Sequence, residues 1–339
     1  MFRWPWSKPK RTPPPVHVFV DFASPAEREE TVPWTPPIDL SEVTANWYPG
    51  AVFRRLHTVL TWWESGDLAE AVLAPALPIL KPFVQAMASF RLLADSPADR
   101  PEIDDDLWDL YALSRVNEFL LMHLQTRPTE SSEDVWPLKG AELSRAAYES
   151  FMQALGFEPV EARPFHPFFH EITDVSVDPD LGDQVIVMRE DWPGYRFGDL
   201  MFSRAGVAVR AGPLSGLDGM AARSNLYFAY HRRFRQTRDL SMGWGSNSQW
   251  RTRFRRDYLD GSVLRFNVDG AYQLGEPNPS ELWDTDRIET LEGDGFNPAE
   301  RIAFLRHRCL TRTRADSSDF WPYDDAFSEP MPPEQLPPW

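Results

Sequence analysis

Apolar residues recur at helical spacing three times in the first half of the chain. Spacings of three and four residues place such side chains on one face of a helix. The three stripes are Val52, Leu56, Val59, Leu60 and Trp63; Leu110, Leu113, Val116, Leu120 and Leu124; and Leu143, Ala147, Phe151 and Leu155. Pro49 suits a helix start, and Gly156 stands where a helix commonly ends. The pattern therefore predicts a helical region over residues 42–156.

An apolar stretch at 69–90 lies between the first two stripes. It contains Glu70, Lys81 and three prolines, Pro75, Pro78 and Pro82. Proline removes a backbone donor and crowds the preceding helical turn. We therefore expect the stretch to be interrupted, and we expect no membrane span.

The pattern changes near residue 160 to short β-type runs bounded by Gly, Pro and Asp. These runs are QVIVMRE (184–190), AGVAVRAG (205–212) and SVLRFNVDG (262–270). One later helix is expected at 297–309, where Asn297 suits an N-cap and Pro298 the first helical position. The sequence thus predicts an α+β fold: an N-terminal helical subdomain followed by a mostly antiparallel β-rich subdomain with a late helix.

Four regions follow from these changes in pattern. Residues 1–41 are rich in proline and are expected to form a partly disordered arm. Residues 42–156 are the helical subdomain, and residues 157–314 are the β-rich subdomain. Residues 315–339 form an acidic, aromatic, proline-rich tail.

Composition narrows the classes of function. The formal net charge of −16 argues against a general nucleic-acid binder, because phosphates require a positive surface. It is compatible with a basic protein partner. Cys309 is the only cysteine, so no intrachain disulfide and no cysteine-based zinc cluster can form. We expect a soluble, cytoplasmic protein.

One segment, 223–257, departs from this acidic background. It holds nine arginines against two aspartates, Asp239 and Asp257; the arginines are Arg223, Arg232, Arg233, Arg235, Arg238, Arg251, Arg253, Arg255 and Arg256. In an extended chain, Arg251, Arg253, Arg255 and Asp257 share one face, and the aromatic residues share the other. The sequence GWGSNSQ inside the segment adds amide and hydroxyl groups, but its glycine spacing is not that of a phosphate-binding loop.

The arginine segment permits two interpretations. In the first, planar guanidinium groups and loop amides bind an anion or an acidic group of a partner. The ligand-binding residues would then be Arg232, Arg233, Trp244, Asn247, Gln249, Arg251 and Arg255. In the second, the arginines pair with the chain's own carboxylates and stack on its own aromatic rings.

The motif PFHPFFHEI contains the histidines best placed for chemistry. His166 and His170 are four residues apart, with Glu171 adjacent, so they share a face in either a helix or a strand. Ordinary packing histidines are expected there, rather than a metal site or a cofactor. If the protein is an enzyme, His170 or Asp239 would transfer protons.

The leading interpretation is a binding or interaction protein of the toxin-neutralising or adaptor type. Its arginine-rich surface at 223–257 would receive an acidic group, and its acidic surface would receive a basic protein partner. One alternative is an enzyme acting on an anionic, possibly phosphorylated, small molecule. The other is a structural protein whose arginines are paired internally. Whether the chain is an enzyme stays open at this point.

Overall fold

Three helices form where the apolar stripes predict them. The computed structural model describes residues 51–63, 66–93, 103–124, 141–217, 254–270, 272–275, 298–307 and 325–335, all of which belong to one compact unit, 35–339. The helices are α2 (Ala51–Trp62), α4 (Ile103–Met122) and α5 (Arg145–Ala154). The Ser144 side chain caps α5 by accepting a hydrogen bond from Ala147 N at 3.2 Å. Gly156 follows the end of α5 with a φ of 93°, which confirms its expected role.

The stretch 69–91 is continuously helical, so the expectation that prolines interrupt it is wrong. A π-helical turn, η2 (Ala69–Leu73), leads into α3 (Ala74–Ala86), and a 3-10 turn, η3 (Met87–Arg91), follows. Pro78 and Pro82 lie inside α3 on its exposed side, where water can hydrate the carbonyls that lose their donors.

By length and composition alone, Ala69–Arg91 is also the one described helix that could cross a membrane. A third of its apolar window is buried inside the protein. The absence of a membrane span therefore stays a prediction.

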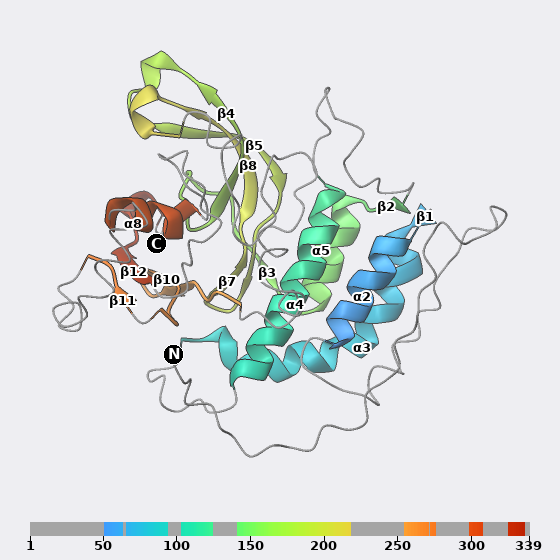
Figure 1. Ribbon diagram of the computed structural model, residues 1–339. Helices are drawn as coiled ribbons and strands as arrows, with labels where there is room; N and C mark the ends of the chain where they lie inside the picture. The colour runs from blue at the N-terminus through green and yellow to red at the C-terminus, as the bar shows by residue number, and fades with distance from the viewer. Residues whose placement is uncertain are drawn as a thin grey trace, which may run out of the picture. The chain divides into compact units, whose positions relative to one another are not determined.

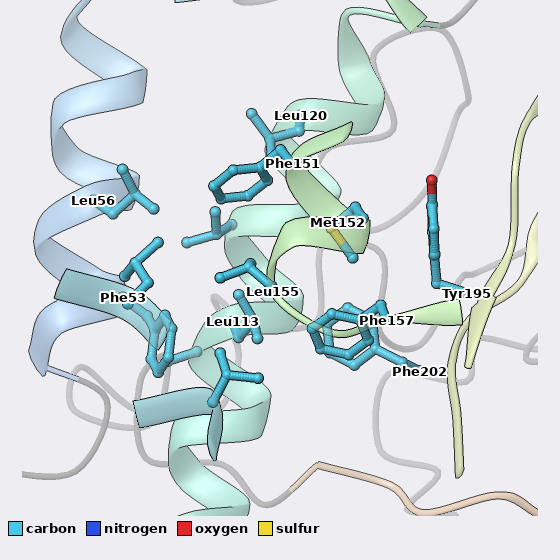
Figure 2. Packing of buried hydrophobic residues seen from close by; sticks show 14 of the residues in the cluster. Phe53, Leu56, Leu113, Leu120, Phe151, Met152, Leu155, Phe157, Tyr195 and Phe202 are labelled. Atoms are coloured by element: carbon cyan, nitrogen blue, oxygen red, sulfur yellow. The ribbon is translucent and has the colours of Figure 1, made fainter. Parts of the chain in front are cut away.

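The helices share a hydrophobic core with part of a β-sheet. Figure 2 shows Phe53 and Leu56 from α2 facing Leu113 and Leu120 from α4, with the Phe151 ring of α5 between them. Met152, Leu155, Phe157, Tyr195 and Phe202 continue the same cluster toward the strands. We call this cluster the helical core. Burial of its apolar side chains supplies the main favourable contribution to the free energy of folding.

Within the described residues, the larger sheet has seven strands in the order β11-β12-β10-β9-β7-β6-β3. The strands are β3 (Glu158–Pro159), β6 (Tyr195–Phe197), β7 (Leu200–Ser203), β9 (Tyr258–Asp260), β10 (Val263–Phe266), β11 (Tyr272–Gln273) and β12 (Asp325–Pro330). Most neighbouring strands described in it are antiparallel, and β11 and β12 pair in parallel. A separate short parallel pair joins β1 (Gly66–Asp67) to β2 (Ala141–Glu142). The predicted α+β class and the order of its parts are confirmed.

Both faces of the larger sheet are covered at β7. Leu200 and Phe202 belong to the helical core, whereas Met201 between them belongs to a second apolar cluster. That second cluster includes Phe168, Phe169, Leu264, Phe266 and Leu305, so it joins the sheet to α8 (Pro298–His307), the predicted late helix. A strand buried on both faces reads as a continuous apolar run, as LMF does here.

A second sheet has three strands in the order β4-β8-β5 (Figure 1). Its strands are β4 (His170–Val177), β5 (Val185–Trp192) and β8 (Ala205–Ala211). The central strand β8 pairs in parallel with β4 and antiparallel with β5. Gly206 on β8 lies beneath the Trp192 ring, and a Cβ atom there would meet that ring at 2.2 Å.

The helices and the larger sheet are joined by polar contacts as well as by the core. Tyr258 OH donates to Phe90 O at 2.9 Å, and Asp199 N donates to Arg91 O at 2.7 Å. Gly198, in the β6–β7 turn, has a φ of 62° and approaches Arg91 so closely that a Cβ atom would lie 2.5 Å from its carbonyl oxygen. Only glycine fits both requirements.

Part of the predicted tail is built into the larger sheet. Within 315–339, the structure describes residues 325–335, which form β12 and the 3-10 turn η9 (Pro333–Gln335). β12 pairs antiparallel with β10 along four residues. Ala326, Met331 and Gln335 are buried, so this part of the tail contributes to the fold.

Candidate functional site: a buried cluster around Asp257

Asp257 is the centre of a group of buried polar side chains. Its carboxylate is fully buried and accepts hydrogen bonds from Arg255 at 3.1 Å (Nε to Oδ1) and 2.9 Å (NH2 to Oδ2). Arg204 NH2, from the β7–β8 turn, donates to Oδ2 at 3.1 Å, and the backbone N–H of Asn267 donates to Oδ1 at 2.9 Å. Two of these bonds form a bidentate pair, the geometry that guanidinium and carboxylate groups favour.

The same two arginines bind the last turn of α8. Arg255 NH2 donates to Leu305 O at 2.8 Å, and Arg204 NH1 donates to Arg306 O. The carbonyls at the C-terminal end of a helix lack partners within the helix and carry its negative dipole. Arg204 and Arg255 therefore satisfy these carbonyls and join the helix end to Asp257. We call Arg204, Arg255, Asp257 and Asn267, with the carbonyls of this turn, the Asp257 cluster.

Asn267 connects the Asp257 cluster to β12. Its φ of 50° lies in the left-handed region, which asparagine tolerates better than most residues. This conformation directs its N–H to Asp257, and its Nδ2 donates to Asp325 O at 2.6 Å. Asp325 is itself fully buried and forms a bidentate pair with Arg301 of α8, with Nε to Oδ2 at 2.7 Å.

Two further arginine–carboxylate pairs border this region. Arg306, at the end of α8, pairs with Glu329 of β12, and its guanidinium lies over the Phe327 ring with 5.0 Å to the centroid. Arg256 binds Asp269 through Nε at 2.8 Å and NH2 at 2.5 Å. Like the Arg301–Asp325 pair, the Arg306–Glu329 pair joins α8 to β12, the elements that lie together in Figure 1.

Three histidines, which we call the histidine group, lie beside these pairs and are held neutral. The pKa values of His166 and His170 are lowered to about 4, and that of His307 to about 3. Burial is the largest cause for all three; the charge of Arg204 contributes to each shift, and the charge of Arg306 contributes to those of His166 and His307. At neutral pH these rings are therefore uncharged, because a second positive charge beside the arginines is unfavourable.

Backbone hydrogen bonds engage one ring nitrogen of His166 and one of His170. His170 Nδ1 accepts from His166 N at 3.0 Å, and His166 Nδ1 accepts from Phe168 N at 3.1 Å. The neutral His166 ring therefore carries its proton on Nε2. His170 Nδ1 also lies 3.1 Å from His166 O, so it faces both a backbone donor and a backbone acceptor of His166. His166 Nε2 lies 3.9 Å from Glu329 Oε1, too far for a hydrogen bond.

These histidines stand in a turn that leads into β4, as the proline- and phenylalanine-rich sequence around them indicates. In the described part of the chain, no three His, Cys, Asp or Glu residues are grouped to hold a metal ion. The Nδ1 atoms of His166 and His170 are both engaged by backbone groups of the same turn.

Of the predicted site residues, the structure describes His170 and Arg255. Arg204 is what relates them: it shares Asp257 with Arg255, and its charge contributes to the lowered pKa of His170. Both side chains are buried, which differs from the solvent-facing arrangement expected of the arginines. The other predicted residues, Arg232, Arg233, Asp239, Trp244, Asn247, Gln249 and Arg251, lie outside the described residues.

The alternation predicted for the arginine segment holds where the structure describes it. Arg255 and Asp257 bind each other on one side of the extended chain, and Arg256 donates to Tyr258 OH at 3.4 Å on the other. The sequence placed Asp257 on the same face as Arg255, but no role was predicted for it. Its position two residues from Arg255 was a usable signal for a pair, whereas nothing in the sequence pointed to Arg204.

Chemically, the Asp257 cluster holds charges in fixed places. Its guanidinium groups are occupied by carboxylates and helix carbonyls, and the nearby imidazoles are neutral. Such an arrangement positions α8 and β12 against β9 and β10, and it makes that region sensitive to protonation. No protein-family model, no curated protein and no solved structure matches the chain.

Proposed function

We propose that this protein is a binding or interaction protein whose acidic surface receives a basic protein partner. The observation that carries the proposal is the excess of acidic side chains, 51 Asp and Glu against 35 Lys and Arg. Arg204, Arg255, Arg256, Arg301 and Arg306 all pair with carboxylates of the same chain. Each such pair uses one cation for at most one carboxylate, so at least 16 carboxylates of the chain have no lysine or arginine left to pair with. Such a surface attracts positively charged partners and speeds their association.

The second half of the proposal concerns the rest of the arginine segment. Arg232, Arg233 and Arg251, with Trp244, Asn247 and Gln249, would receive an acidic group of the partner. This half rests on the sequence alone, because these residues lie outside the described residues.

The experiment compares basic and acidic probes on the full chain. A polylysine peptide should bind by isothermal titration calorimetry, with an affinity that falls as salt is added, because the attraction is between exposed charges. A polyglutamate peptide should bind only through the arginine segment. An Arg232→Gln/Arg233→Gln/Arg251→Gln variant should therefore lose polyglutamate binding and keep polylysine binding.

The enzyme alternative predicts a different result. Phosphate, nucleotides, sugar phosphates or dicarboxylates would then raise the midpoint of thermal unfolding, because a ligand that binds the folded state stabilises it by mass action. A clear shift with one small anion, together with no binding of polylysine at low salt, would replace the present proposal with that one.

A further inference from the structure

One end of the three-stranded sheet exposes large apolar side chains. Met188 is 53% exposed and Ile186 39% on β5, while Val177 is 46% exposed at the end of β4 and Leu214 78% in the 3-10 turn η6 (Pro213–Ser215). Val177 pairs with Ala211, which belongs to the small apolar cluster of this sheet, so Val177 lies on the opposite face from Ile186 and Met188. We call Ile186 and Met188 the sheet tip. Scattered exposed apolar residues are ordinary, but a contiguous group marks an interaction surface.

Hydrogen bonds gather the four residues at the same end of the sheet. Asp178 N donates to Ala211 O at 3.0 Å, which joins the end of β4 to the end of β8. Leu214 N donates to Gly182 O at 2.9 Å, which joins η6 to the turn between β4 and β5. In β5, Ile186 pairs across from Arg210 of β8, next to the Val185–Ala211 pair.

The burial pattern directs Ile186 and Met188 away from the core of this sheet. Val185 and Val187 pack against a small apolar cluster that includes Ile172, Val207 and Leu217, and they are partly buried. Ile186 and Met188 alternate with them and are exposed. Met188 stands at a β-bulge, where the register with β8 shifts between Val187 and Arg189. Nothing in the described residues covers this face.

Exposed aspartates lie on β4 and in the turn that joins β4 to β5. Asp174, Asp180 and Asp183 are exposed, and Asp178 has one cation nearby, Arg210, at 3.8 Å (Nε to Oδ2). Further along β5, Arg189 is already bound by Asp191, with Nε to Oδ1 at 2.5 Å. The surface thus combines an apolar middle with a negatively charged rim, the usual composition of a protein-binding surface.

We infer that the sheet tip docks a basic, amphipathic segment of the protein partner. This inference rests on the proposed function and names where the partner binds. Apolar side chains of the segment would cover Ile186 and Met188, and its lysines or arginines would meet Asp174, Asp180 and Asp183. Burial supplies affinity at the centre, and the charges steer the approach and exclude acidic competitors.

The charge of the rim also decides against a second copy of this chain as the occupant. Two sheet tips brought together would set the aspartates of one against the aspartates of the other. Like charges placed opposite one another at an interface are unfavourable. A basic segment meets the same surface without that penalty.

The test measures binding of three labelled peptides to the full chain by fluorescence anisotropy. One peptide alternates lysine with leucine, the second alternates lysine with serine, and the third alternates glutamate with leucine. The lysine–leucine peptide should bind at least about tenfold more tightly than the other two, because only it has both the charge and the apolar side chains.

Variants then locate the site. Ile186→Ser/Met188→Ser should weaken binding of the lysine–leucine peptide about tenfold, and Asp180→Asn/Asp183→Asn should weaken it and reduce its salt dependence. Leu92→Ser is the matched control, since Leu92 is 65% exposed at the end of η3 and should leave binding unchanged. All of these side chains are exposed, so thermal unfolding should stay within about 1–2 °C of the parent chain.

Three results would overturn the inference. Unchanged binding by both double variants would place the basic partner elsewhere while leaving the proposed function intact. Equal binding of the lysine–serine peptide would show that charge alone acts. A dimer, seen by light scattering, that Ile186→Ser/Met188→Ser dissociates would make a second copy the occupant. If neither polylysine nor any basic peptide binds, the proposed function itself fails.

Discussion

The helical core and the Asp257 cluster stabilise the chain by different means. In the helical core, Phe53, Leu56 and Leu120 are buried among other apolar side chains, and stability grows with the apolar area removed from water. Around Asp257, the buried groups are guanidinium and carboxylate groups that must be paired in place. Removing charges from water is costly, so such pairs define a geometry more than they add stability. We therefore expect the stability of the helical core to depend on side-chain volume, and that of the region around Asp257 to depend on charge.

The largest effect is expected from removing the central carboxylate. Asp257→Ala leaves Arg204 and Arg255 without their shared partner in a buried site, and the free energy of unfolding should fall by about 3–5 kcal/mol. Urea denaturation followed by circular dichroism measures this loss. Hydrogen exchange should rise first in peptides that cover α8 and β12.

The control for this prediction keeps the volume and removes only the charge. Asp257→Asn should cost nearly as much as Asp257→Ala, since the amide cannot accept from both guanidinium groups as the carboxylate does. A cost below about 0.5 kcal/mol for Asp257→Asn would show that charge does not organise this region.

The stability of the helical core should depend on the volume of its buried side chains. Leu56→Ala removes a fully buried side chain between α2 and its neighbours, and should lower the free energy of unfolding by about 2–5 kcal/mol. The loss should be the same at pH 5 and pH 8, because no ionisable group is involved. Leu92→Ala, at an exposed position, should change stability by no more than about 0.5 kcal/mol. A strong pH dependence of the Leu56→Ala cost would contradict the contrast between the two regions.

The histidine group should make stability depend on pH. The pKa of His170 is about 4 in the folded chain, against about 6.5 for an unperturbed histidine, so below pH 6.5 the unfolded chain takes up more protons. Stability is therefore complete above about pH 6.5 and falls as the pH drops toward 4. The slope is at most about 1.4 kcal/mol per pH unit for each histidine. Urea midpoints of His170→Gln and the parent chain, measured from pH 7.5 to 4.5, should diverge in this range; parallel curves would refute the assignment.

The smallest effect on stability is expected at an exposed ion pair of the larger sheet. Arg265 Nε lies 2.7 Å from Asp260 Oδ2, and both side chains are about 40% exposed. Arg265→Gln should cost about 0–1 kcal/mol, and added salt should hide the difference. Urea denaturation at low and high salt checks this. A cost comparable to that of Asp257→Ala would mean that burial is not what separates the two kinds of pair.

Much of the helical half could be predicted from the sequence, because its information is local. The stripe from Leu110 to Leu124 predicts the helix α4, although α4 also buries polar residues outside the stripe, such as Asp109 and Asn117. The exception is α3, where Pro78 and Pro82 suggested a break. Their effect depends on which side of the helix meets solvent, and that is set by tertiary packing rather than by nearby residues.

The Asp257 cluster could not be predicted in the same way. Its partners come from the β7–β8 turn, the start of β9, the end of β10 and α8, and sequence spacing does not show which of these meet. The net excess of arginine in 223–257 suggested a surface for a ligand, and for Arg255 the structure shows a buried pair instead. Whether the rest of the segment binds an acidic group stays a prediction.

The pairing of β12 with β10 has a consequence for how the chain is made. During translation, α2, α4 and α5 emerge early and contain most of their own packing partners, so they can associate while synthesis continues. By contrast, the last turn of α8 and the strand β12 emerge after Arg204, Arg255 and Asp257, whose surroundings they complete. We expect this half of the molecule to mature only after residue 330 has left the ribosome, and until then its charged side chains depend on water as their partner.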